Sequence, residues 1–122
     1  MKGMRKTTAA EFRLFKAECQ KWIKYFGLLD WRVFFDHNKI DDKTYAIASL
    51  SNLEDRNVTI VLNIDFIAGL DIYRTAFHEV CELLLHPLEH IGSCRYAQPE
   101  ELEAARHAII RTLENTVYKD LK

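Results

Sequence analysis

The sequence predicts an α+β domain, with an N-terminal helix, a small three-stranded sheet and two further helices packed on one face of the sheet. Three observations support this fold class: helical periodicity near the N-terminus, three short segments rich in β-branched and aromatic residues, and two later helical patterns. No linker, repeat or low-complexity tract divides the chain. We therefore expect residues 1–122 to form a single domain, with residues 1–7 as a flexible tail.

The first helix is expected to begin at a capping box and to end at a glycine. In the segment Thr8-Ala9-Ala10-Glu11, the Thr8 hydroxyl and the Glu11 carboxylate can each accept the other residue's backbone N–H. Apolar residues follow at helical spacing: Phe12, Phe15, Cys19, Trp22, Ile23 and Phe26. Gly27 follows the last of them and is a common stop signal for a helix.

Three strands are expected next, over residues 30–35, 44–50 and 58–63. The polar segments 36–43 and 51–57 separate them. Because residues 58–63 directly precede the next helix, we expect this strand to offer a free edge to which an extended substrate can add.

The following helix combines an apolar arc with a polar stripe. Asp71 is its expected N-cap, and it should end near Leu85 because the next residue precedes Pro87 and is pushed out of helical geometry. Each residue of an α-helix turns the chain by about 100° around the helix axis. Measured around that axis, the other ionisable residues of the segment lie within about 100° of His78. The stripe consists of His78, Glu79, Glu82 and His86, and the opposite arc consists of Phe77, Val80, Leu83 and Leu84.

Two members of this stripe have chelating spacing. His78 and Glu82 lie four residues apart, so their side chains approach to about 5–6 Å and can share one ion at about 2.0–2.2 Å. Glu79 is turned away from that ion but can lie beside a water bound to it, which is the position of a general base. Glu82 and His86 have the same spacing, but His86 falls at the expected end of the helix, so His78 is preferred.

The last helix is expected over residues 100–114, with an apolar stripe formed by Leu102, Ala105, Ile109, Leu113 and Val117. Glu103 and His107 lie on the border of that stripe, four residues apart. One or both side chains should therefore face the element on which this helix packs.

The stretch from His78 to Glu82 resembles the zincin metallopeptidase signature His-Glu-x-x-His, with Glu82 in place of the second histidine. Residues 28–115 are similar to the minimal zincin core of small SprT-like and minigluzincin-like metallopeptidases, and more narrowly to short proteins of tailed bacteriophages and prophages. The resemblance implies a zinc-dependent peptidase in which His78, Glu82 and His107 are the zinc ligands and Glu79 is the general base. Two imidazoles, one carboxylate and an open water position suit catalytic zinc.

Charge and composition indicate which partners the protein binds and in which compartment it is located. The formal charge is −1, and basic residues gather only at the N-terminus, so we expect no nucleic-acid surface. No run of about 20 apolar residues and no signal peptide is evident, so we expect no membrane partner and a cytoplasmic location, the host cytoplasm if the protein is phage-encoded. Three cysteines, Cys19, Cys81 and Cys94, form no C-x-x-C pair and fit reduced thiols. His37 and His90 are expected to be solvated.

The sequence thus predicts zinc-dependent hydrolysis of peptide bonds in a peptide or protein substrate. One alternative is a non-catalytic phage protein that binds a host protein, in which a fourth protein ligand such as Glu103 or Cys94 closes a structural zinc site. The other is a metal-free interaction domain whose polar stripe forms hydrogen bonds between helices.

Overall fold

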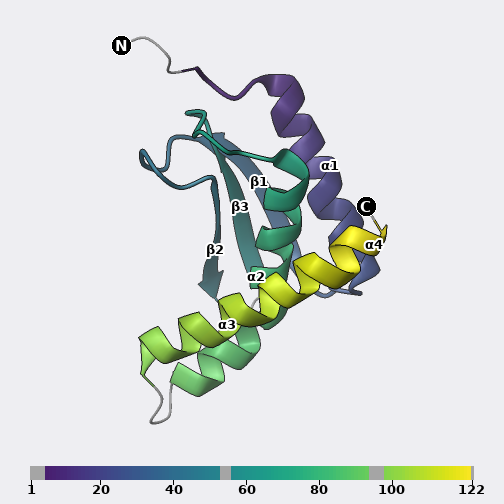
Figure 1. Ribbon diagram of the computed structural model, residues 1–122, viewed down its shortest axis with the longest axis vertical. Helices are drawn as coiled ribbons and strands as arrows, with labels where there is room; N and C mark the ends of the chain where they lie inside the picture. The colour runs from purple at the N-terminus through teal and green to yellow at the C-terminus, as the bar shows by residue number, and fades with distance from the viewer. Residues whose placement is uncertain (1–4, 53–55, 94–97, 122) are drawn as a thin grey trace.

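The computed structural model describes residues 5–52, 56–93 and 98–121, which confirm the predicted α+β fold. In chain order the elements are α1 (Ala9–Tyr25), β1 (Arg32–Asn38), β2 (Ala46–Asn52), β3 (Asn57–Asn63), α2 (Ile72–Ser93), α3 (Pro99–Leu113), the π-helical turn η1 (Glu114–Tyr118) and α4 (Lys119–Leu121). Figure 1 shows α1 and α2 running alongside the sheet and α3 crossing α2.

Helix α1 has the ends that the sequence predicts. The Thr8 hydroxyl accepts the backbone N–H of Glu11 at 3.0 Å, and the Glu11 carboxylate accepts the backbone N–H of Thr8 at 2.8 Å. At the other end Gly27 adopts a φ of 72°, a left-handed conformation that glycine reaches without a steric penalty. The inward face of α1 buries Phe15, Cys19 and Trp22.

The sheet has the strand order β1-β3-β2, with β1 parallel and β2 antiparallel to β3. Its central strand carries Val58, Ile60 and Leu62, all fully buried, and a strand this apolar must be covered on its inward face. Our expectation that residues 58–63 offer a free edge is therefore wrong, because β3 pairs on both sides. The edge strand beside α2 is β2.

Helix α2 begins as predicted, because the Asp71 carboxylate accepts the backbone N–H of Arg74 at 3.2 Å. Its buried arc is also close to the prediction, with Phe77, Val80 and Leu83 inaccessible to solvent and Leu84 only half-buried. Like the other helices in the described part of the chain, α2 is not long and apolar enough to cross a membrane.

The expected end of α2 near Leu85 is wrong, because the helix continues through Pro87 to Ser93. A proline inside a helix removes one backbone hydrogen bond and costs about 3 kcal/mol. Tertiary packing can offset such a cost, since most helical stability in proteins comes from buried faces. Leu85 and Leu88, on either side of the proline, line an apolar cleft together with Leu102 and Ala105 of α3.

The segment before α1 is anchored, so the predicted flexible tail is wrong for residues 5–7. Lys6 forms a β-bridge and an ion pair with Asp65, and Thr7 is only 4% exposed. The Thr7 hydroxyl is hydrogen bonded to Nε2 of His37 at 2.6 Å, and the His37 ring stacks on Phe12 at a centroid distance of 5.0 Å. His37 is thus a packed residue of β1 and not the solvated side chain that we expected.

Substitution of Leu83 tests whether the apolar arc of α2 forms the core. Leu83→Ala should lower the free energy of unfolding by about 2–5 kcal/mol, because it leaves a cavity at a position with no solvent access. Leu29→Ala is the control with the same change of side chain, since Leu29 is 75% exposed and its loss should change stability by less than about 0.5 kcal/mol. Urea denaturation measures both, and equal midpoints would contradict the burial of this arc.

Candidate metal and catalytic site

Three potential ligand atoms gather between α2 and α3. His78 and Glu82 come from one face of α2, and His107 comes from α3 where the two helices cross. One ligand atom from each residue lies within 4.8 Å of the other two. The Oε2 atom of Glu82 is 3.1 Å from Nε2 of His78 and 3.2 Å from Nε2 of His107. The structure therefore brings together the three residues that the sequence singled out.

The arrangement fits a divalent metal ion. In a tetrahedral zinc site with bonds of about 2.0–2.2 Å, neighbouring ligand atoms lie about 3.3–3.6 Å apart. Both distances from Glu82 to the histidines are already close to that range. Two imidazoles and one carboxylate would leave one coordination position for water, which is the pattern of catalytic zinc sites. The group could therefore hold a metal with small side-chain movements.

Glu114 orients the first of these histidines. Its Oε2 accepts from Nδ1 of His78 at 3.3 Å, which directs Nε2 of the same ring toward Glu82. The Glu114 side chain is nearly buried, and Arg74 lies 3.4 Å from its other oxygen. Carboxylates commonly hold metal-binding histidines in this way. We did not expect Glu114 at the site from the sequence, although it follows His107 by seven positions, a spacing that keeps two residues on one helix face.

Arg106 is the second site residue that we did not expect from the sequence. Its Nε lies 2.6 Å from Oε1 of Glu82, and its side chain is only 13% exposed. The apolar stripe that we expected is wrong at Ala105 and Ile109, which are exposed, because α3 turns Ile110 inward. Arg106 lies four positions after Leu102 and four before Ile110, so a charged residue on this otherwise apolar face was the available signal.

The contacts of Glu82 also set the protonation of the site. The hydrogen bond to Glu82 is the main reason why the pKa of His78 is raised to about 9. Burial opposes ionisation of Glu82, but the hydrogen bond from His78 and the charge of Arg106 outweigh it and lower the pKa of Glu82. At neutral pH and without a metal, an imidazolium therefore faces a carboxylate.

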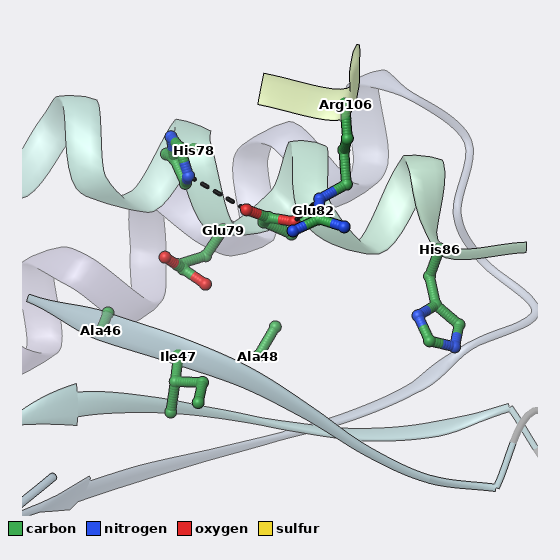
Figure 2. Close-up of a pocket in the computed structure, with 8 residues that line it drawn as sticks. All are labelled: Ala46, Ile47, Ala48, His78, Glu79, Glu82, His86 and Arg106. Atoms are coloured by element: carbon green, nitrogen blue, oxygen red, sulfur yellow. Dashed lines mark hydrogen bonds and ion pairs between the residues drawn. The ribbon is translucent and has the colours of Figure 1, made fainter. Parts of the chain in front are cut away.

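Glu79 occupies a different environment one residue along the helix. It is only 7% exposed, and burial is the main cause that raises its pKa to about 8. The backbone N–H of Ala48 in β2 donates a hydrogen bond to its carboxyl group. Figure 2 shows this carboxyl reaching from α2 into the space above β2, apart from the Glu82 carboxylate. A carboxyl group with this pKa is matched to proton transfer near neutral pH.

Two adjoining cavities flank the site along β2. The first has a volume of about 420 Å³ and is lined by Ala46, Ile47, Ala48, His78, Glu79, Glu82, His86 and Arg106 (Figure 2). The second, of about 380 Å³, lies toward the start of β2 and α2, and its lining includes Tyr45, Thr75 and Glu114. Ala46, His78 and Glu79 line both cavities. His78 and Glu79 therefore lie where the two cavities meet, whereas His107 lines neither of them.

Among the described residues, the alternative ligands His86 and Glu103 are not part of the group. His86 lines the first cavity, and Glu103 is exposed on α3. Our reason for preferring His78 over His86, an early end of the helix, is wrong even though His78 is the residue that meets Glu82 and His107. Cys94 and the side chain of His90 lie outside the described residues.

Comparisons with protein-family models, with curated proteins and with solved structures found no match. The resemblance to minimal zincins therefore stays a prediction. The assignment of the site rests on the positions of its side chains.

The protonation of Glu79 and His78 predicts how the stability of metal-free protein depends on pH. Glu79 binds its proton more tightly when folded, so its contribution to stability falls as pH rises from about 4.5 to about 8. The contribution of His78 is complete below about 6.5 and is lost as pH rises through about 9. The free energy of unfolding should thus decrease between pH 5 and 9, with a slope limited to about 1.4 kcal/mol per pH unit for each proton.

Glu79→Gln should flatten this decrease between pH 5 and 8, because the amide does not ionise. Chelator-treated wild type and variant would be compared by urea denaturation at a series of pH values. Glu103→Gln is the matched control, since Glu103 is exposed and its loss should leave the slope unchanged. A wild-type slope that survives in Glu79→Gln would contradict the buried, protonated state of Glu79.

Proposed function

We propose that this protein is a zinc-dependent peptide hydrolase, in which His78, Glu82 and His107 hold the ion and Glu79 is the general base. The observation that carries the proposal is the gathering of three ligand atoms within 4.8 Å of one another, beside a buried carboxyl group in a groove. Residues of these types at such distances are suited to zinc.

The chemistry follows from the roles of these side chains. Bound zinc lowers the pKa of its water toward about 7 and polarises a carbonyl group. Glu79 accepts the proton of the attacking water and donates it to the leaving amine. A nearby cation favours the ionised form of a carboxyl group, so an occupied site would lower the pKa of Glu79 from about 8 and prepare it as a base.

The groove supports an extended peptide as the substrate. The carbonyl oxygen of Tyr45 accepts from Asn63 of β3 at 3.0 Å, so residue 45 faces the neighbouring strand. In an antiparallel pair, successive residues point their backbone groups alternately toward and away from the partner strand, so Ala46 and Ala48 direct theirs toward the edge of β2 that faces Glu79. The N–H of Ala48 already donates to Glu79, which leaves its carbonyl oxygen and the backbone groups of Ala46 for a peptide. A peptide paired with this edge would pass Glu79, and cavities on both sides of the site leave room for chain in both directions.

One observation favours the metal-free alternative. Glu82 already contacts His78, His107 and Arg106, so its charge is compensated without an ion. In that case the polar stripe would tie α2 to α3 in a domain that binds a protein partner. The metal content of the purified protein distinguishes this alternative from a metallopeptidase.

Protein purified without an affinity tag should contain about one zinc per chain, as measured by elemental analysis. His78→Ala and His107→Ala should each reduce zinc affinity by more than the roughly 10–100-fold typical of residues that only support a ligand. His86→Ala is the matched control, because His86 lines the same cavity outside the ligand group. If His78→Ala and His107→Ala kept as much zinc as His86→Ala, the ligand assignment would be contradicted.

Glu79→Gln should keep its zinc and lose most hydrolytic activity, because the amide preserves the shape of the side chain but cannot accept a proton. General-base removal lowers rates by about 10²–10⁴-fold. Zinc-loaded wild type and variant would be incubated with a mixed peptide library, with cleavage followed by mass spectrometry. Equal rates would exclude Glu79 as the base, and zinc-loaded protein that cleaves no peptide would favour a binding domain.

A further inference from the structure

We infer that Arg106 is a positioning residue that occupies one oxygen of Glu82 and leaves the other as the single oxygen available to a metal between His78 and His107. This inference rests on the proposed zinc site. It assigns to Arg106 the geometry of that site and not a contact with substrate.

The two oxygens of Glu82 have separate partners. Oε1 lies 2.6 Å from Nε of Arg106, whereas Oε2 lies 3.1 and 3.2 Å from the Nε2 atoms of His78 and His107. Figure 2 shows the guanidinium group of Arg106 beside the Glu82 carboxylate, on the side away from His78. The oxygen nearest to the other candidate ligands is therefore the one that Arg106 does not hold.

This division of the carboxylate has a consequence for coordination. A carboxylate that binds through both oxygens takes two positions on a metal, and with two histidines it would fill a four-coordinate site. A carboxylate that binds through one oxygen leaves the fourth position for water, which catalytic zinc requires. By holding Oε1, Arg106 would keep Glu82 in the one-oxygen mode.

The location of Arg106 suits such a role. It directly precedes His107 on α3, so one helical turn supplies both a candidate ligand and the group that orients another ligand on α2. Its side chain is largely buried and lines both the first cavity and the apolar cleft formed with Leu85 and Leu102. Packing of this kind restricts the rotamers of a long side chain, as a positioning residue requires.

Charge alone would have the opposite effect on metal affinity. A guanidinium near a divalent cation repels it, so a purely electrostatic role predicts that Arg106→Gln binds zinc more tightly. A positioning role predicts weaker binding, because the freed carboxylate can rotate. Arg106→Lys keeps the positive charge but lacks the planar donor group, so positioning predicts an intermediate affinity whereas charge alone predicts wild-type affinity.

The test measures zinc affinity by competition with a chromophoric chelator, and coordination by the visible spectrum of the cobalt-substituted protein. We expect Arg106→Gln to bind zinc about 10–100-fold more weakly than wild type and to change the cobalt spectrum, because the second oxygen of Glu82 can then replace the water or join it as a fifth ligand. Arg111→Gln is the matched control, because Arg111 is exposed on the same helix and its loss removes the same charge. Its affinity and spectrum should equal those of wild type.

Two results would overturn the inference while leaving the zinc site in place: unchanged or tighter zinc binding by Arg106→Gln with the wild-type cobalt spectrum, or a loss of equal size in Arg111→Gln. If Arg106→Gln also destabilises the metal-free protein, Arg106→Lys decides, and wild-type affinity and spectrum in that variant would overturn the inference. Wild-type protein that binds neither zinc nor cobalt would overturn the zinc site itself, and the role of Arg106 with it.

Discussion

The arrangement of α2 and α3 depends on the contacts that the Glu82 carboxylate makes with both helices. Its side chain is only 20% exposed, and a largely buried carboxylate is tolerated only where charged or polar partners replace the lost water. One partner, His78, is on the same helix, and two, Arg106 and His107, are on α3. The crossing of the two helices is therefore specified by polar contacts at the site as well as by the apolar cleft beside it.

A cluster of aromatic side chains packs against α2 next to the candidate metal site. Phe77, which precedes His78, lies 4.7 Å from Trp22 of α1 and 5.2 Å from Tyr118 of η1, measured between ring centroids. Large aromatic side chains pack with specific geometry and contribute strongly to a small core. Because Phe77 and His78 are adjacent in α2, the packing of Phe77 also fixes the position of the His78 backbone. Helix α1 and η1 thus help to position the candidate site although neither contributes a candidate ligand.

The parts of the structure that the sequence predicted are those set by local spacing. The capping box at Thr8, the stop at Gly27 and the shared face of His78 and Glu82 depend on residues within one or two helical turns of one another. His107 was predicted less directly, from a resemblance and from its position beside an apolar stripe. Its contact with Glu82 follows from the crossing of α3 over α2.

The missed features depend on tertiary contacts, whose partners local spacing does not identify. The central position of β3 arises from pairing across the chain, and the passage of α2 through Pro87 reflects packing against α3. Arg106 of α3 and Glu114 of η1 had sequence signals in their spacing from Leu102 and His107, but spacing alone does not identify the partner of either side chain. Only the approach of α2 gives each of them a carboxylate or imidazole to contact.

In the π-helical turn η1, the number of residues between the buried side chains matters as much as the side chains themselves. Ile110, Glu114 and Tyr118 are buried at intervals of four residues, a spacing that drifts by about 40° per step in a regular α-helix. The wider turn takes up that drift, so Glu114 meets His78 while Tyr118 meets the aromatic cluster. Substitutions at the exposed positions of η1 should be tolerated, whereas deletion of a single residue would rotate Tyr118 by about 100° and separate the two contacts.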